Sequence, residues 1–306
     1  MQHQPVLLNE ILEHLTPSRE DGTLVDATVG LGGHSEALLE RHPNIRLLGI
    51  DRDPAALERS QARLSRFGGR VTLVRGRHES LIDILKQSGI HEISGLLADL
   101  GVSSMQLDDA DRGFSFRFDA PLDMRMGSEG RSAADLVNEL DEFELTRILR
   151  DYGEEPMARR IARAIVHARV TGPIETTTQL AGIIKSVKRQ RYGDIDPATL
   201  TFQALRIATN EELVGLEQFV DDAVRILEPK ARVAIISFHS LEDRIVKRAF
   251  RRLEGECTCP PNLPVCGCGA KAVIEQLTGR PVTASEEEES RNPRSRSAKL
   301  RVAEKM

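Results

Sequence analysis

The 306-residue sequence contains no tryptophan, and its nine phenylalanines and two tyrosines make aromatic residues only 4% of the chain. RNA-binding sheets that stack bases on aromatic rings need more such side chains, so that class of fold is disfavoured. Basic residues are not in excess either, because 42 Lys and Arg stand against 47 Asp and Glu, giving a net charge of −5. This balance excludes a uniformly basic nucleic-acid coat but allows a local basic face.

Long hydrophobic runs are also absent. No stretch approaches the ~20 apolar residues that a membrane helix needs. The first residues lack a basic region, and their apolar run is broken by Asn9, Glu10 and Glu13, unlike a signal peptide. The sequence therefore predicts a cytoplasmic protein with no membrane segment.

Cysteine is scarce and confined to one short segment near the end of the chain. In a reducing compartment this clustering makes a disulfide framework improbable. Four thiolates at short spacing can close a tetrahedral zinc site, but each pair here is separated by one residue rather than two. A zinc site and a metal-free segment both remain open. The four residues are Cys257, Cys259, Cys266 and Cys268.

Short apolar runs alternate with helical stretches in the first hundred residues. This alternation, with near-continuous apolar runs, is typical of a mostly parallel sheet covered on both faces, which is a Rossmann-like α/β fold. Ser35 is placed to cap the first of the helices, and Pro54 lies in the first turn of the next. The expected strands are Thr23–Ala27, Arg46–Ile50, Val71–Val74, Ile93–Ala98 and, much later, Arg232–Phe238.

The gap between the fourth and fifth expected strands far exceeds the dozen or so residues that a crossover needs. Asp108 to Arg131 has the composition of a loop, and from Ala133 to Lys188 apolar residues recur at helical spacing. We therefore expect residues 1–106 and 212–306 to form one domain and 107–211 to form an inserted all-α domain. A helix is expected over Glu212 to Leu227, ending before Pro229, and an edge strand at Leu300 to Ala303.

Three carboxylates stand at or near the ends of expected strands: Asp26, Asp51 and Asp99. The loop Gly30-x-Gly32 follows the first, and Asp51 comes about 20 residues later, the spacing of a carboxylate that binds ribose hydroxyls. This arrangement predicts a nucleoside site at one edge of the sheet. Nearby carboxylates would repel a pyrophosphate, so the charge pattern favours S-adenosylmethionine over a dinucleotide.

Six segments distributed over nearly the whole chain resemble the ribosomal RNA small subunit methyltransferase H family. The resemblance implies a class I methyltransferase that uses S-adenosylmethionine to methylate the exocyclic N4 of a cytidine in the decoding region of 16S rRNA. It also implies that any metal at the cysteines is structural, because not every member of the family has them. The segments are GLGGHSEALL (30–39), LLGIDRDPAAL (47–57), GLLADLGVSSMQLDDADRGFSFRFDAPLDMRM (95–126), TFQALRI (201–207), ISFHSLEDRIVK (236–247) and NPRSRSAKLRVAE (292–304).

The resemblance also assigns roles to individual residues of a cofactor pocket. Asp51 would hold the ribose, and His78 would lie on the adenine side, where some members have phenylalanine. Asp99 would complete the pocket between the two ends of the cofactor. The full set is Gly32, Gly33 and His34 on the methionine moiety, with Asp51, His78, Asp99 and Gln106.

Methylation of a cytosine amine requires a proton acceptor, because positive charge develops on a nitrogen whose lone pair is delocalised into the ring. Asp99 is the expected catalytic acceptor. Many amino-methyltransferases have Asp/Asn-Pro-Pro-aromatic at this position, and Asp99-Leu100-Gly101-Val102 lacks the prolines and the aromatic ring. Other residues must therefore position the base. The candidates are Phe114, Phe116 and Phe118, and His239 with Ser240, of which His239 is the second expected catalytic residue.

Basic residues occur in three groups that could form one electrostatic track for RNA, although a solvated helix face is the usual meaning of any single run. The expected partner is 16S rRNA, within the small ribosomal subunit. The groups are Arg244, Lys247, Arg248, Arg251 and Arg252; Lys185, Lys188, Arg189 and Arg191; and Arg291, Arg294, Arg296 and Lys299.

Two other functions fit parts of the sequence. An NAD-dependent oxidoreductase could use the Gly30–Gly32 loop, and would change dinucleotide fluorescence on binding. A non-catalytic RNA-binding ribosome assembly factor could have a degenerate methyltransferase fold, but the presence of Asp26, Asp51 and Asp99 argues against such decay.

Overall fold

The computed structural model describes residues 5–103, 109–127, 129–190, 195–257, 259 and 269–306. The chain divides into two compact units. The first comprises residues 1–101 and 214–306, and the second comprises residues 102–213, a slightly longer span than the 107–211 expected.

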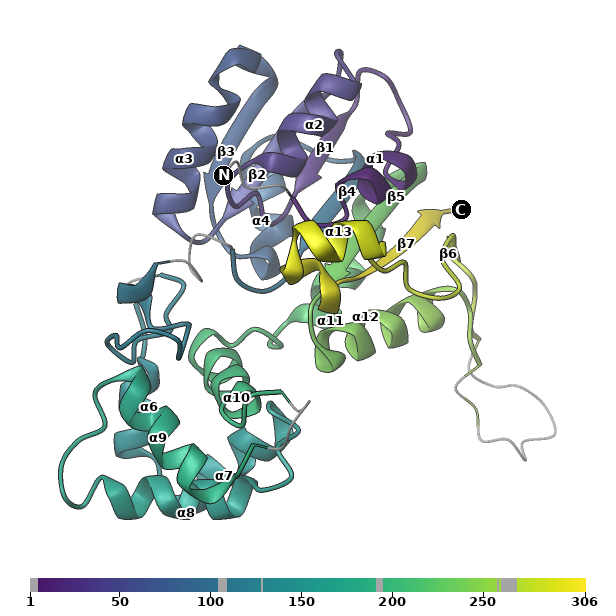
Figure 1. Ribbon diagram of the computed structural model, residues 1–306. Helices are drawn as coiled ribbons and strands as arrows, with labels where there is room; N and C mark the ends of the chain where they lie inside the picture. Colours follow the sequence, from purple (N-terminus) through teal and green to yellow (C-terminus); the bar gives the residue numbers. More distant parts are fainter. Residues whose placement is uncertain (1–4, 104–108, 128, 191–194, 258, 260–268) are drawn as a thin grey trace. The chain divides into compact units, whose positions relative to one another are not determined.

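A seven-stranded sheet forms the centre of the described part of the first unit, in the order β3-β2-β1-β4-β5-β7-β6 (Figure 1). The first five strands run parallel, whereas β7 is antiparallel to both of its neighbours. The predicted mostly parallel α/β fold is thereby confirmed. The strands are β1 (Thr23–Asp26), β2 (Arg46–Asp51), β3 (Val71–Arg75), β4 (Ile93–Asp99), β5 (Leu227–Ser237), β6 (Ile274–Gln276) and β7 (Lys299–Lys305).

Helices cover both faces of this sheet. On one face α1 (Leu8–His14), α2 (Gly33–Arg41) and α3 (Pro54–Leu64) pack over alternate strand residues such as Leu24 and Leu97. On the other face lie α4 (Leu81–Gln87), α11 (Leu216–Ile226) and α12 (Ser240–Leu253). Shorter elements are the 3-10 helices η1 (Ser65–Arg70), η2 (His78–Ser80) and η4 (Pro293–Ser297), and α13 (Glu286–Arg291).

Three local predictions are wrong. The strand at the C-terminus is not at an edge, because the short β6 pairs with the outer side of β7. Ser35 does not cap α2, because Gly32 (φ 75°) occupies the cap position and the helix begins at Gly33. The helix expected over Glu212 to Leu227 begins only after Gly215 (φ 72°), and Pro229 lies inside β5.

Local sequence explains why α3 begins at Pro54, as predicted. Pro54 is the first residue of α3, and Asp53 caps it by accepting a hydrogen bond from the backbone N–H of Ala55 at 3.0 Å. Proline suits this position because the first N–H groups of a helix have no partner within it. None of the described helices is long and apolar enough to cross a membrane.

The second unit is helical, as predicted. Its described residues form no strand, only one isolated bridge between Pro121 and Thr176. Leu145, Leu149, Ile161, Ile165 and Leu205 are among the residues that form its apolar core. The helices are α6 (Ala133–Glu139), α7 (Glu142–Asp151), α8 (Ala158–Ala168), α9 (Thr177–Val187) and α10 (Thr199–Asn210), preceded by η3 (Ala110–Arg112).

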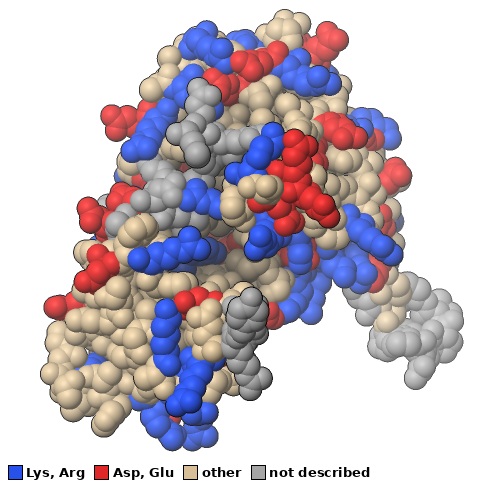
Figure 2. Space-filling model, in the orientation of Figure 1, with Lys and Arg blue, Asp and Glu red and all other residues tan. Residues whose placement is uncertain are grey.

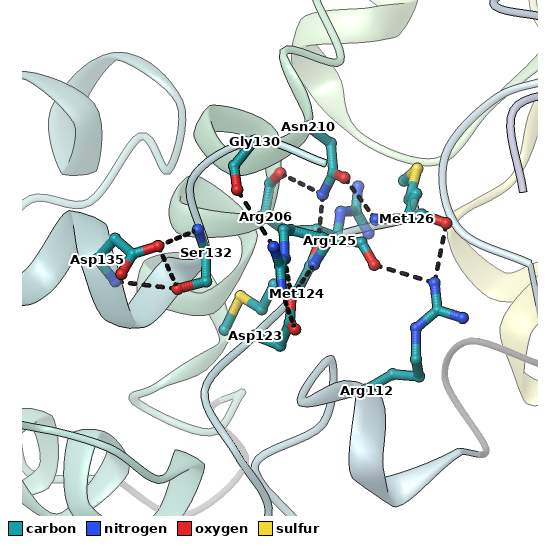
Figure 3. Close-up of polar contacts among 10 residues, drawn as sticks. All are labelled: Arg112, Asp123, Met124, Arg125, Met126, Gly130, Ser132, Asp135, Arg206 and Asn210. Atoms are coloured by element: carbon teal, nitrogen blue, oxygen red, sulfur yellow. Dashed lines mark hydrogen bonds and ion pairs between the residues drawn. The ribbon is translucent and has the colours of Figure 1, made fainter. Parts of the chain in front are cut away.

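The loop that enters this unit is held in place by Asn210 at the end of α10 (Figure 3). The side-chain amide of Asn210 donates to the carbonyl of Met124 at 2.7 Å, and its oxygen accepts from the N–H of Met126 at 2.8 Å. Met124 is fully buried and has a left-handed backbone (φ 60°), which is strained for a residue with a side chain. Arg112 donates to the carbonyls of Arg125 and Met126 at 3.0 and 2.9 Å.

Replacing Asn210 by leucine is expected to destabilise the inserted unit by about 2–4 kcal/mol, because two buried backbone groups lose their partners. Urea unfolding of the full chain, with hydrogen exchange across 112–135, measures the loss. As a control, Asn44→Leu changes an exposed loop residue and should alter stability by less than ~0.5 kcal/mol. Equal stability of the two variants would contradict the anchoring role of Asn210.

Candidate active site

The three carboxylates singled out in the sequence lie at one edge of the sheet. β2, β1 and β4 are adjacent and parallel, so their carboxyl ends bring Asp51, Asp26 and Asp99 next to one another. In open parallel sheets this edge is where ligands bind.

The loop between β1 and α2 is fixed to the ends of both neighbouring strands. Gly30 (φ 51°) donates its N–H to Asp51 Oδ2 at 2.8 Å, which ties the loop to β2. Thr28 accepts a hydrogen bond on its Oγ1 from the N–H of Asp99 at 2.6 Å, which ties it to β4. Thr28 stands where related loops usually have their first glycine, and the structure gives it this bridging role.

The start of α2 leaves no room for side chains at its two glycines. A Cβ on Gly33 would lie 2.5 Å from Pro5 Cγ, and one on Gly32 would lie 3.3 Å from Leu64 while the backbone there is left-handed. Glycine at both positions therefore lets the loop pass close to the N-terminal segment and to α3. The backbone N–H groups at this helix start are suited to bind the polar end of a ligand.

Asp51, which was predicted to bind ribose, accepts hydrogen bonds from two backbone N–H groups. Its Oδ2 accepts from the N–H of Gly30, and its Oδ1 accepts from the N–H of Asp53 at 2.9 Å. Each oxygen has a further lone pair available, since an ionised carboxylate offers about four acceptor positions. Burial raises the pKa of Asp51, and the two hydrogen bonds oppose that rise.

Asp26 is enclosed by protein. Its side chain accepts from Ser35 Oγ at 2.6 Å and from the N–H of Thr28 at 3.2 Å, and the residue is only 2% exposed. Burial raises its pKa to about 6, and the neighbouring Asp51 contributes to the rise. Asp26 therefore orders the loop between β1 and α2 from a buried position.

Asp99 is the carboxylate whose hydrogen-bonding capacity is left unused. Its Oδ1 is buried and accepts no hydrogen bond from any described residue. Burial, together with the charges of Asp26 and Glu242, raises the pKa of Asp99 to about 8. A buried acceptor without a donor is costly, and in a native protein it points to a missing ligand or substrate group.

Two histidines lie at this edge of the sheet in different surroundings. His34 Nε2 donates to the buried carbonyl of Val6 at 2.8 Å, which leaves Nδ1 without a proton in the neutral ring, 3.8 Å from Asp99 Oδ2. The His78 ring meets Phe219 edge to face with centroids 4.9 Å apart. Burial lowers the pKa of His78, so that its ring is neutral at pH 7.

His239 lies at the N-terminus of α12, directly after β5, the strand next to β4. It packs against Glu242, a residue that the sequence analysis missed. Glu242 is 1% exposed, accepts from the N–H of Phe238 at 2.8 Å, and has Oε1 3.2 Å from His239 Nε2. The spacing of His239 and Glu242 is that of a capping box, which is the signal that could have identified Glu242.

The remaining candidates lie in the second unit, beyond the end of α12, or outside the described residues. Phe114 is buried in the core of the inserted unit, Phe116 packs edge to face on Phe202, and Phe118 is exposed. Gln106, Cys266 and Cys268 lie outside the described residues, whereas Cys257 and Cys259 follow the end of α12. The zinc site therefore stays a prediction.

The model of the MraW methylase family matches residues 1–306. The ribosomal RNA small subunit methyltransferase H of Geobacter sulfurreducens is 53% identical over 308 residues, covering 99% of each chain. The protein of the same name from Heliobacterium mobile is 50% identical over 311 residues, again covering 99% of each. Among solved structures, a putative rRNA-methylase from Clostridium thermocellum has a TM-score of 0.45 at 11% identity, with full coverage of both chains. The chain belongs to the MraW methylase family.

Proposed function

We propose that this protein transfers a methyl group from S-adenosylmethionine to the exocyclic N4 of a cytidine in the decoding region of 16S rRNA. Family membership and the names of relatives that are half identical over the whole chain support rRNA methylation. The observation that carries the chemistry is the buried, unpartnered oxygen of Asp99 at the edge of the sheet where the loop of β1 and the cap of α12 meet.

The edge of the sheet that carries Asp26, Asp51 and Asp99 is called the carboxylate edge below. It fits S-adenosylmethionine better than a dinucleotide. Burial raises the pKa of each of the three carboxyl groups; Asp51 adds to the rise at Asp26, and Asp26 with Glu242 adds to the rise at Asp99. A pyrophosphate would add to this repulsion, whereas a cation relieves it. This argues against the oxidoreductase alternative, and the membership in a methylase family argues against a non-catalytic assembly factor.

Each part of the cofactor has a matching group in the chain. When bound, S-adenosylmethionine supplies the methyl group on a positively charged sulfur, beside an ammonium and a nucleoside. Asp51 would accept the ribose hydroxyls, and His78 would lie on the adenine side. The glycines 32 and 33, His34, Asp99 and Gln106 would complete the pocket.

The residues beside Asp99 suit proton transfer from an amine. Asp99 would accept a hydrogen bond from the attacking nitrogen and stabilise its developing positive charge. His239, held by the buried carboxylate of Glu242, is the second group at this edge that could orient the base. No Asp-Pro-Pro-aromatic segment is present, so other residues would have to position the base.

Transfer of labelled methyl groups tests the proposal. Wild-type protein would be incubated with labelled S-adenosylmethionine and either assembled small subunits lacking the modification or naked 16S rRNA, followed by digestion to nucleosides. We expect label in N4-methylcytidine from one of the two substrates. Label only in another nucleoside, or in none, would contradict the proposal. The choice of substrate, the cytoplasmic location and the structural zinc stay predictions.

Replacing Asp51 by alanine is expected to weaken S-adenosylmethionine binding by about 10- to 100-fold, because two hydroxyls lose a charged acceptor worth ~1.5–3 kcal/mol. Calorimetry measures the change. Asp83→Ala removes an exposed carboxylate of the same type from α4 and should leave the affinity unchanged. Unchanged affinity in Asp51→Ala would refute the ribose assignment.

A further inference from the structure

One face of α12 carries a row of cations. The helix buries Leu241, Glu242, Val246, Ala249 and Phe250, which lie along one side. Positions one helical turn apart on the opposite side are Arg244, Lys247, Arg248 and Arg251. These four residues are called the basic ridge below. Figure 2 shows Lys and Arg side chains gathered below the acidic run of α13, over the region of α12 and β7.

Most other cations singled out in the sequence are neutralised. Lys188 pairs with the buried Glu155 at 2.7 Å, and Lys185 pairs with Asp196 at 2.9 Å. Arg252, although on α12, turns toward α11 and pairs with Asp221 at 2.6 Å.

Cations of the C-terminal group, near α13, are also paired with acids. Arg291 lies 3.3 Å from Glu287 and Arg296 lies 3.6 Å from Glu289, both acids of α13. The C-terminal cations thus largely cancel against the acidic run beside them.

Three residues of the basic ridge, Lys247, Arg248 and Arg251, largely keep their charge. Within the part of the chain that the structure describes, Lys247 and Arg248 form no ion pair, and Arg251 only approaches Glu256 at 3.8 Å. The acid on the flank of the ridge, Asp243, is itself held by Arg301 at 2.7 Å and lies 3.7 Å from Lys299.

The ridge begins beside the carboxylate edge and leads away from it. β5 pairs with β4 so that Ile236 is opposite Asp99, and α12 starts four residues later at Ser240. Fourteen residues at ~1.5 Å each make a rod of about 20 Å. Cations recur along it every three or four residues, about one turn apart, which suits successive phosphates of a nucleic-acid strand.

We propose that the basic ridge binds the phosphate backbone of the RNA strand on one side of the target cytidine. The inference rests on the proposed function, and it assigns to this one helix a backbone contact that is independent of base sequence. An acidic protein surface could also bind such a row of cations. The ridge, however, starts beside Asp99 and runs away from it, so it favours an RNA strand whose target cytidine reaches Asp99.

A pair of triple variants tests the ridge. Lys247→Gln, Arg248→Gln and Arg251→Gln remove three charges from it, while Arg41→Gln, Arg46→Gln and Arg59→Gln remove three exposed charges from elsewhere in the same unit. Binding of a decoding-region 16S rRNA fragment is measured from 50 to 300 mM salt. At about 0.7 counterions per single-strand contact, the ridge variant should lose about 2 from the slope of log affinity against log salt, and at least tenfold in affinity near 100 mM. The control should retain the wild-type slope.

Three further measurements separate the possible outcomes. S-adenosylmethionine affinity should be equal in all three proteins, which shows that the variants fold. The methylation rate at saturating RNA should be retained by the ridge variant, because the ridge binds and does not react. Equal salt slopes in the ridge variant and wild type, or loss of binding to polyglutamate with RNA binding unchanged, would overturn the proposal. Failure of wild type to methylate cytidine N4 would instead contradict the proposed function.

Discussion

Asp99→Asn is expected to slow methyl transfer by about 10²- to 10⁴-fold in a single turnover with S-adenosylmethionine saturating. The substitution keeps the size of the side chain and one acceptor oxygen, but it removes the negative charge that stabilises a positive nitrogen in the transition state. Oδ1 of Asp99 is buried and makes no hydrogen bond to any described residue, so its acceptor capacity is available for the amine.

Rate and affinity measured on this one variant separate two roles. A lower rate at saturating cofactor places Asp99 on the amine, whereas a rate that recovers at saturation places it on the cofactor. Asp83→Asn, an exposed carboxylate on α4, serves as the matched control and should be fully active. A fully active, tightly binding Asp99→Asn protein would contradict an active site at the end of β4.

Much of the sheet could be predicted because its strands are buried on both faces. Leu24 and Val25, or Leu96 and Leu97, point to opposite faces yet are all within 1% of complete burial, so each strand is a nearly continuous apolar run. The carboxylates that end these runs then fall at one edge by the geometry of parallel strands. Asp26, Asp51 and Asp99 could be placed together for this reason.

The errors have different physical causes. β6 has three residues, of which only Ile274 is buried, so it leaves almost no periodic signal, and its pairing moves β7 away from the edge. Ser35 has the residue type of a cap, but its hydroxyl is bound to Asp26, nine residues earlier in the chain. A long-range contact of this kind has no local signature.

The pairing of charged side chains could not be predicted from the sequence either. The sequence shows where arginines and lysines stand, but only the packing decides which are neutralised. Glu155 is buried among helices and binds Lys188 from a distant part of the unit, while Lys247 and Arg248 have no such partner among the described residues. Of the expected track, the face of α12 that carries Lys247 and Arg248 keeps its charge in the described part of the first unit.

The affinity for S-adenosylmethionine is expected to rise with pH by up to about 50-fold between pH 6 and pH 8. Burial and the charges of Asp26 and Glu242 raise the pKa of Asp99 to about 8, so the free protein carries a proton there at neutral pH. A bound cation favours the carboxylate and should hold its pKa below 6 in the complex. Binding then releases one proton, and affinity rises by nearly a factor of ten per pH unit below pH 8, then levels off above pH 8 as the carboxyl group of the free protein becomes ionised.

Calorimetry from pH 6 to pH 9 measures this slope, and Asp99→Asn provides the control. The ligand's own amine titrates equally with both proteins, so the difference between their slopes reports Asp99 alone. Asp26, whose pKa is raised to about 6, contributes mainly below this range. S-adenosylhomocysteine lacks the sulfonium charge and should show a shallower rise. Parallel slopes in wild type and Asp99→Asn would mean that Asp99 is already ionised in the free protein. The cofactor would then not lower the pKa of Asp99 on binding, which would contradict the prediction.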